Sequence, residues 1–330
     1  MNKKQLRVEE YVEGILSGNR VVLSQAITLI ESTRNDHQLL AHQILERCLP
    51  TIKSHLRIGI TGVPGVGKST FIEAFGRVAI ERGHRVAVLA IDPSSRLNRG
   101  SILGDKTRME ALSMHPNAYI RPSAAGDSLG GVARKTRETI LLCEAAGFDT
   151  VLVETVGVGQ SETAVRDLTD FFLLLLLPNA GDELQGMKRG IVEMCDWIAI
   201  NKSDTNPTAA KIARTQYNNA LHLFPRKENN WAASSSLCSA INGEGIEEIW
   251  DKINEFLNDM KNQGFIEKNR QQQSLFWLHE SIKQELNRLF AQSPFVNASL
   301  QRLENEVLTQ KKAVSQATQE LIKLFLNEKI

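Results

Sequence analysis

Gly62-Val63-Pro64-Gly65-Val66-Gly67-Lys68-Ser69 is the most informative stretch of this chain, because it fits the phosphate-loop pattern G-x-x-x-x-G-K-[ST]. An apolar run, Arg57-Ile58-Gly59-Ile60, precedes it, and helical spacing follows it as far as Arg82. Glycines let backbone N–H groups approach phosphate oxygens, and the start of a helix favours an anion. The pattern predicts a nucleotide site in which Lys68 reaches the β and γ phosphates and Ser69 ligates Mg²⁺. The residues expected around the phosphates are Gly62, Val63, Pro64, Gly65, Val66, Gly67, Lys68, Ser69 and Thr70.

Downstream of residue 56, short runs rich in Val and Ile alternate with helical patterns. This alternation is typical of an α/β fold with a mostly parallel sheet. Several runs lack a polar–apolar alternation, as expected for strands that are covered on both faces. The expected strands cover residues 56–61, 85–91, 118–121, 150–154, 171–177, 197–201 and 235–239. Together with the phosphate loop they predict the P-loop NTPase fold.

The two ends of the chain read as helical extensions. We expect an N-terminal helical extension over residues 1–50, a nucleotide domain over 51–262 and a C-terminal helical arm over 263–330. The arm carries an apolar stripe at helical spacing, formed by Leu275, Leu278, Ile282, Leu286 and Leu289. The stripe either packs on the nucleotide domain or pairs two subunits. We favour pairing, because a tail beyond a complete domain has little core left to cover.

Composition excludes some function classes. The formal net charge of the 330 residues is +1, which gives no strong field for nucleic acid or an anionic membrane. The longest apolar run, residues 171–177, is too short to span a bilayer, and the N-terminus lacks a secretory signal pattern. The cysteines Cys48, Cys143, Cys195 and Cys238 form no C-x-x-C pair and are expected to be buried, reduced thiols. These features predict a cytoplasmic protein.

Asn201-Lys202-Ser203-Asp204 closes another apolar run and matches the N-K-x-D arrangement that selects guanine. The Asp204 carboxylate can accept from N1–H and the 2-amino group of guanine together. Adenine offers neither donor, so the same carboxylate would be left unpaired. Lys202 is expected to pack its stem along the base. Ser239-Ala240, after the next expected strand, resembles the S-A element whose backbone N–H meets guanine O6.

Two carboxylates stand at the ends of expected strands, Asp92 and Glu154. Acidic groups at the carboxyl ends of parallel strands face the ligand crevice, so both are candidate Mg²⁺ ligands beside Ser69. Glu154-Thr155-Val156-Gly157 resembles the D-x-x-G switch with Glu in place of Asp. Gly157 is expected to offer its N–H to the γ-phosphate, so that the following loop responds to hydrolysis.

The residue after Gly157 is Val158, where Ras-like enzymes carry the glutamine that orients water. Gln160 lies three positions after Gly157. The sequence leaves open whether it takes over the role of that glutamine. We therefore expect slow intrinsic turnover that a partner accelerates. Asp105 and Arg108 are candidates to position water and neutralise charge, and Asp105 is also a candidate Mg²⁺ ligand. The alternative for both is a solvated charged loop.

Four longer motifs together resemble one family, the P-loop GTPases that accompany adenosylcobalamin-dependent methylmalonyl-CoA mutase. They are Ile91-Asp92-Pro93-Ser94-Ser95, Gly104-Asp105-Lys106-Thr107-Arg108-Met109, Glu154-Thr155-Val156-Gly157-Val158-Gly159-Gln160-Ser161-Glu162 and Gly181-Asp182-Glu183-Leu184-Gln185-Gly186. Bacterial members are called MeaB or ArgK and were formerly labelled lysine/arginine/ornithine transport ATPases or kinases. The resemblance runs from about residue 10 to about residue 290.

The resemblance implies a GTPase of the SIMIBI class, which includes signal-recognition-particle and metal-insertion GTPases. It implies a homodimer, held partly through C-terminal helices, that gates cofactor loading into the mutase and protects it. The stretch from Asp182 to Lys188 matches a third switch that relays the nucleotide state to the mutase. Gln160, Gln185 and Lys188 are the candidate residues for this partner switch. One departure from the family pattern is Pro178-Asn179-Ala180-Gly181, which lacks a glycine beside the proline.

Two other functions compete with this reading. A metal-insertion GTPase would carry Cys or His at metal-ligand spacing, whereas the seven histidines are scattered along the chain. A kinase of a lysine/arginine/ornithine transport system would be expected to carry a kinase-type catalytic loop, and the sequence offers none. The sequence therefore favours a GTP- and GDP-binding chaperone of an acyl-CoA mutase.

Overall fold

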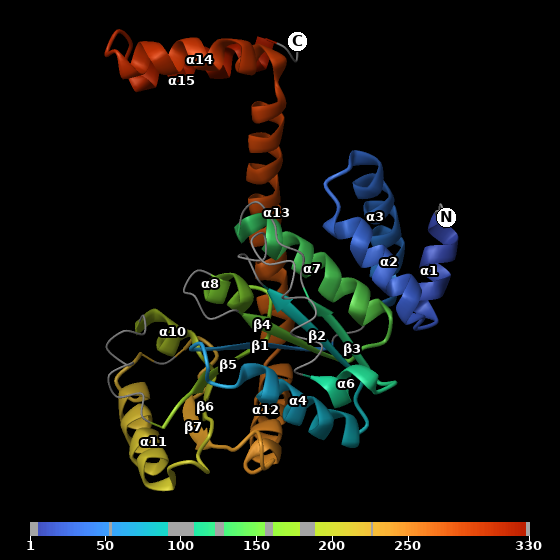
Figure 1. Ribbon diagram of the computed structural model, residues 1–330, viewed down its shortest axis with the longest axis vertical. Helices are drawn as coiled ribbons and strands as arrows, with labels where there is room; N and C mark the ends of the chain where they lie inside the picture. The colour runs from blue at the N-terminus through green and yellow to red at the C-terminus, as the bar shows by residue number, and fades with distance from the viewer. Residues whose placement is uncertain are drawn as a thin grey trace. The chain divides into compact units, whose positions relative to one another are not determined.

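The computed structural model describes residues 6–52, 55–91, 109–122, 129–155, 161–178, 189–225 and 227–327. Its sheet has seven strands, all parallel, in the order β3-β2-β4-β1-β5-β6-β7 (Figure 1). The strands are β1 (Leu56–Gly62), β2 (Val86–Ile91), β3 (Ala118–Pro122), β4 (Thr150–Thr155), β5 (Phe171–Leu176), β6 (Trp197–Ile200) and β7 (Ser234–Leu237). Every strand expected from the sequence is confirmed, and so is the α/β fold class.

β5 explains why the sequence pattern of the central strands is uniformly apolar. All six of its residues, Phe-Phe-Leu-Leu-Leu-Leu, are buried. Helices cover both faces of the sheet, so neither set of alternating side chains meets water. The run of seven apolar residues is therefore a core strand.

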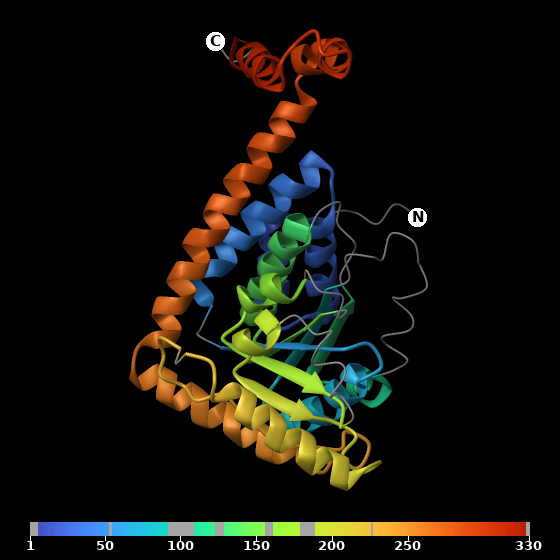
Figure 2. The same ribbon diagram turned by 90° about the vertical axis from the view of Figure 1, so that its left-hand side faces the viewer.

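One face of the sheet is covered by α4 (Lys68–Glu81), α6 (Glu110–Met114) and α12 (Ile246–Asn262), as Figures 1 and 2 show. Aromatic rings fill this layer. Phe75 of α4 lies 5.4 Å from Trp250 of α12, and Phe171 of β5 lies 5.0 Å from Phe256, measured between ring centroids. These contacts fix α4, the helix that follows the phosphate loop, against the sheet.

The opposite face carries α7 (Leu129–Ala145) and α8 (Ser161–Arg166). α8 lies close to β1 because Gly59 has no side chain. A Cβ at Gly59 would stand 2.8 Å from Cγ1 of Val165 and 2.7 Å from the Phe172 ring. β1 therefore presents a flat surface to α8 at the centre of the sheet.

The N-terminal helices α1 (Val8–Leu16), α2 (Arg20–Glu31) and α3 (Asn35–Cys48), followed by the short helix η1 (Leu49–Thr51), pack beside α7. Glu31 at the end of α2 forms an ion pair with Arg121 of β3. Lys135 of α7 donates to the Glu31 carbonyl oxygen at 2.7 Å. Both cations act where a helix C-terminus favours positive charge.

The other helices are α10 (Arg189–Met194), α11 (Pro207–Leu221), α13 (Phe265–Gln292), α14 (Pro294–Leu308) and α15 (Val314–Asn327). The chain divides into two compact units, Met1–Gln273 and Ser274–Ile330. In the second unit α14 packs on α15, and the Phe290 ring lies 5.5 Å from that of Phe325. None of the helices in the described ranges is long and apolar enough to cross a membrane. All four cysteines are buried free thiols, as the sequence predicted.

Candidate nucleotide site

The loop between β1 and α4 depends on two glycines. Gly67, the N-cap of α4, has a φ of +90°, and a Cβ there would stand 3.0 Å from Nδ2 of Asn201. A Cβ at Gly62 would lie 2.5 Å from the Leu175 carbonyl oxygen, which real Cβ atoms do not tolerate. Val66 is fully buried and packs the loop against the hydrophobic core. The loop thus keeps its backbone open only because these positions lack side chains.

The loop leads directly into the first turn of α4, which Lys68, Ser69 and Thr70 occupy. The N–H groups of a first helical turn have no partner within the helix, and the helix dipole adds partial positive charge there. Gly65 and Thr70 are exposed, so an anion has access to this turn. The arrangement is the one that binds phosphate groups.

The Lys68 ammonium turns back onto the loop. Nζ donates to the carbonyl oxygens of Gly62 at 2.8 Å and Val63 at 3.4 Å. Burial lowers the pKa of Lys68, because a desolvated ammonium is disfavoured, and the carboxylates of Glu154 and Glu162 oppose that shift. Lys68 is therefore a partly desolvated cation beside the helix start, held by weak acceptors that a phosphate oxygen would outcompete.

Asn201, just after β6, joins the phosphate loop to the loop after β7. It is 2% exposed, and its Nδ2 donates to the Val66 carbonyl oxygen at 2.9 Å. Its Oδ1 accepts the Ala240 N–H at 3.0 Å. One buried amide thus satisfies a donor and an acceptor on two different loops.

Lys202 and Asp204 lie on the exposed side of the same turn. Lys202 has a φ of +57°, and its Nζ donates to the Gly65 carbonyl oxygen at 2.9 Å, so its stem lies over the phosphate loop. Asp204 is exposed, and its carboxylate makes no hydrogen bond or ion pair with any residue that the structure describes. An accessible carboxylate next to the Lys202 stem suits recognition of a base.

The loop after β7 carries the Ser239-Ala240 pair, for which the sequence predicts a contact with guanine O6. The Ser239 N–H donates to the Glu244 carbonyl oxygen at 2.9 Å, and the Ala240 N–H donates to Asn201. Both N–H groups of the Ser239-Ala240 pair thus have partners within the protein, and a contact with guanine O6 stays a prediction. The next residue, Ile241, is 76% exposed. In this structure the Ala240 N–H holds Asn201, and the Ser239 N–H closes the turn to Glu244.

Glu154 and Thr155 end β4 next to the start of the phosphate loop, since Glu154 is in register with Ile60 of β1. Glu154 is 9% exposed. Thr155 hydrogen-bonds to Thr61 through the two hydroxyl oxygens, 2.8 Å apart, and both side chains are 1% exposed. The parallel pairing of β1 and β4 therefore brings Glu154 to the edge where Lys68 and Ser69 lie.

Glu162 is a candidate functional residue to which we assigned no role from the sequence. It stands in the first turn of α8, is 2% exposed, and raises the pKa of Lys68 together with Glu154. Its place in the quoted motif was visible in the sequence. Its proximity to Lys68 follows from the packing of α8 over β1, which no local pattern predicts.

Several predicted site residues lie outside the described part of the chain: Asp92, Asp105, Arg108, Gly157, Gln160, Gln185 and Lys188. Within the described part, no group of three or more His, Cys, Asp or Glu side chains is arranged to hold a metal ion.

GTP with Mg²⁺ fits the residues that are described. The glycine backbone of the loop leaves room that a Cβ at Gly62 or Gly67 would remove. Lys68 offers a desolvated cation for phosphate, and oxygen donors of the kind that Mg²⁺ prefers are supplied by Ser69 and Glu154. Asp204 offers an exposed carboxylate for a base.

The chain is similar to proteins that are described as GTPases. The family model described as "Methylmalonyl Co-A mutase-associated GTPase MeaB" matches residues 23–294. The GTPase ArgK of Escherichia coli is 48% identical over 288 residues, 87% of each chain. The mouse protein called methylmalonic aciduria type A homolog, mitochondrial, is 43% identical over 335 residues, 98% of this chain and 81% of that protein. A crystal structure described as LAO/AO transport system kinase superposes with a TM-score of 0.75 at 39% identity and covers 97% of both chains.

Proposed function

The chain belongs to the MeaB family of GTPases, and we propose that it is a Mg²⁺-dependent GTPase chaperone of an adenosylcobalamin-dependent methylmalonyl-CoA mutase. In this proposal it gates cofactor loading into the mutase and protects the mutase from inactivation. Its intrinsic turnover is slow, and the mutase accelerates it. The name of the mouse relative includes the word mitochondrial, so a cytoplasmic location for this chain stays a prediction.

The observation that carries the guanine assignment is the bridge made by Asn201. It holds the phosphate loop and the loop after β7 in one arrangement, through Val66 at 2.9 Å and Ala240 at 3.0 Å. Asp204 follows three residues later and is exposed. The phosphate-binding and base-reading parts are thereby held at a fixed spacing, which supports binding of one nucleotide across both.

Each part of the chain has a proposed task in hydrolysis. The first turn of α4 and Lys68 bind the phosphates, and Asp204 selects guanine. Ser69 and Glu154, with Asp92 and Asp105, hold Mg²⁺, which when bound neutralises charge on the phosphates. Asp105 and Arg108 position water and neutralise developing charge, and Gly157 binds the γ-phosphate through its N–H.

The partner-facing residues are Gln160, Gln185 and Lys188, in the stretches that the family resemblance assigns to switches. The arm after residue 263 is proposed to form a homodimer. Support for this comes from its apolar side chains, since Leu278, Ile282 and Leu286 are 54%, 47% and 54% exposed. A monomer rarely leaves such a stripe in water.

GTP turnover with and without purified methylmalonyl-CoA mutase tests the proposal, with ATP as the control substrate. We expect a low basal GTP rate that rises at least several-fold with mutase, and no ATP turnover. An unchanged GTP rate would leave a guanine-nucleotide switch with a different client. Preference for ATP would contradict the role of Asp204.

A further inference from the structure

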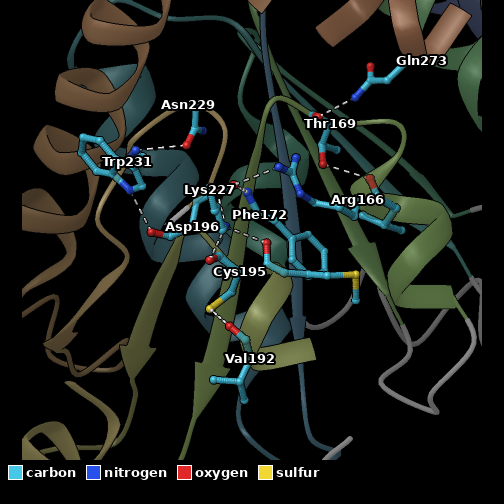
Figure 3. Close-up of polar contacts among 12 residues, drawn as sticks. Arg166, Thr169, Phe172, Val192, Cys195, Asp196, Lys227, Asn229, Trp231 and Gln273 are labelled. Atoms are coloured by element: carbon cyan, nitrogen blue, oxygen red, sulfur yellow. Dashed lines mark hydrogen bonds and ion pairs between the residues drawn. The ribbon is translucent and has the colours of Figure 1, made fainter. Parts of the chain in front are cut away.

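Asp196 is a buried carboxylate in the turn between α10 and β6 (Figure 3). Because the strands are parallel, it lies at the edge of the sheet where β6 starts, opposite the edge where β1 leads into the phosphate loop. Its side chain is fully buried. Its Oδ2 accepts the Phe172 N–H at 2.9 Å, and its own N–H donates to the Phe172 carbonyl oxygen at 2.8 Å. Its carbonyl oxygen accepts from Nε1 of Trp231 at 3.0 Å. Asp196 is therefore rigidly fixed to the start of β5.

Lys227 ties this carboxylate to the end of α10. Its Nζ lies 2.7 Å from Oδ1 of Asp196, 3.0 Å from the Met194 carbonyl oxygen and 2.7 Å from the Cys195 carbonyl oxygen. An ammonium has three donors, so all of them are used here. Two of the three acceptors are backbone oxygens at the C-terminus of α10, where a cation is favoured.

Arg166, the last residue of α8, approaches the same carboxylate from the other side. Its Nη2 lies 4.0 Å from Oδ2 of Asp196, and its side chain is 21% exposed (Figure 3). This is the longest of the charged contacts at Asp196. A small shift of α8 would strengthen or break it, because the interaction of buried charges changes steeply with distance.

α8 starts close to the phosphate loop, and α10 lies next to α8. α8 is the first described element after Glu154 and Thr155. Its first turn carries Glu162, whose negative charge opposes the lowering of the Lys68 pKa by burial. α10 is the first described element after β5. The two helices also contact each other directly. α8 thus begins near Lys68, and both helices end close to Asp196.

The turn after α8 is held still by separate contacts. Asp170 accepts the Arg57 N–H at 3.0 Å and pairs with Arg270 at 2.6 Å. Nε2 of Gln273 donates to the Thr169 carbonyl oxygen at 2.9 Å. α8 therefore reaches α10 by direct packing and by one charged side chain, Arg166, which approaches Asp196.

We propose that Asp196 is a positioning residue that couples α8 to α10, so that a nucleotide-dependent shift of α8 is transmitted through Arg166, Asp196 and Lys227 to α10. This rests on the proposed function only in requiring that the chain bind guanine nucleotides. It does not depend on which protein is the client.

Arg166→Gln is the informative variant: it leaves the contacts of Asp196 with Phe172 and Lys227 in place, so we expect the fold to be retained. Arg82→Gln is the matched control. Arg82 also stands at a helix end and joins two helices, since it pairs with Glu247 of α12 at 3.0 Å, away from α8 and α10. Arg166→Lys tests rescue by a conservative change.

Hydrogen exchange of the full chain, with GDP or a non-hydrolysable GTP analogue, is measured on peptides covering residues 161–170 and 189–196. In the wild type and in Arg82→Gln we expect both peptides to differ between the two nucleotides. In Arg166→Gln the α8 difference should persist while the α10 difference falls by about half or more, and Arg166→Lys should restore it. A full α10 difference in Arg166→Gln, or none in the wild type, would overturn the proposal.

The exchange experiment contains no mutase. If the mutase is not the client, GTP turnover will not rise when mutase is added, but the exchange result expected here stays the same. A chain that bound no guanine nucleotide, tested by GDP titration, would overturn the coupling and the proposed function together.

Discussion

Nδ2 of Asn201 lies 2.9 Å from the carbonyl oxygen of Val66, across 135 positions of sequence. This hydrogen bond joins the loop after β6 to the phosphate loop, and the same side chain accepts the Ala240 N–H. Since Asn201 is 2% exposed, water cannot replace either partner at low cost. The spacing between the phosphate loop and the loop after β7 therefore depends on this amide as well as on the strands that carry the two loops.

Asn201→Ala should weaken nucleotide binding. It leaves the Val66 carbonyl and the Ala240 N–H buried without partners, at a cost of about 1–3 kcal/mol per group. We expect the Kd for GDP to rise about 10-fold or more, measured by titration with a fluorescent GDP. Asn254→Ala is the control, because Asn254 donates to the Trp250 carbonyl oxygen within α12, far from this bridge in the sequence. An unchanged Kd would contradict the structural role given to Asn201.

Asp204→Asn should change which base is bound. Xanthine keeps the N1–H of guanine but carries a carbonyl oxygen in place of the 2-amino group, and an amide can pair with both. We expect affinity for GTP to fall about 100-fold, and binding of xanthosine triphosphate to appear. Competition titrations with both nucleotides measure this. Asp251→Asn, on the exposed side of α12, should change neither affinity; equal effects of the two variants would rule out base reading by Asp204.

The Thr61–Thr155 hydroxyl pair should show non-additive effects on stability. Each single Thr→Val change leaves one buried hydroxyl without its partner, at a cost of about 1–3 kcal/mol in the free energy of unfolding. The double variant Thr61→Val/Thr155→Val removes both hydroxyls and should be more stable than either single variant. Urea unfolding of the four proteins gives the interaction energy. Additive effects would mean that the 2.8 Å contact contributes little.

Glu138 on α7 should make stability depend on pH. Burial raises the pKa of Glu138, and the nearby charges of Arg134, His42, Arg137 and Lys135 oppose that shift only in part. A raised carboxyl pKa in the folded state means that the protonated form stabilises the fold below the unfolded pKa. That contribution is lost as pH rises through the folded pKa.

Glu138→Gln should therefore raise the Tm at pH 8, by about 2–4 °C if the penalty is near 1 kcal/mol, and have no effect near pH 4. Thermal unfolding followed at several pH values tests this. Glu46→Gln, exposed on α3, is the control and should show no such trend. A benefit of Glu138→Gln that is equal at all pH values would mean that the ionisation of Glu138 is not the cause.

The arm should form a dimer through its exposed apolar stripe. Light scattering should give a mass near twice 36.8 kDa for the wild type. Leu278→Asp/Ile282→Asp should give a single-chain mass. Burying two carboxylates in the dimer interface would cost more free energy than the remaining apolar contacts contribute. Lys283→Ala, a 68% exposed neighbour on the same helix, should leave the dimer intact. A monomeric wild type would remove the basis for the dimerisation arm.

The local patterns predicted the strands and the phosphate loop well, for a physical reason. A strand buried on both faces must be apolar throughout, as Phe171–Leu176 is, and a phosphate loop must have glycines where Gly62 and Gly67 stand. The proposed guanine motif N-K-x-D likewise lies in the sequence as a unit, because Asn201 and Asp204 stand in one turn after β6. Each of these requirements falls on residues that are neighbours in the sequence, so a local pattern is enough to predict it.

What the sequence determined alone is therefore the nucleotide class, the parallel sheet and the position of the loop that binds phosphate. The tertiary structure decided that the Ala240 N–H serves Asn201, that Glu162 stands near Lys68, and that Arg166 and Lys227 meet at Asp196. These residues are distant in sequence and belong to different elements. Their contacts arise from the order of strands in the sheet and from the way the helices pack on it. The sequence on either side of each residue does not show which distant residue it will contact.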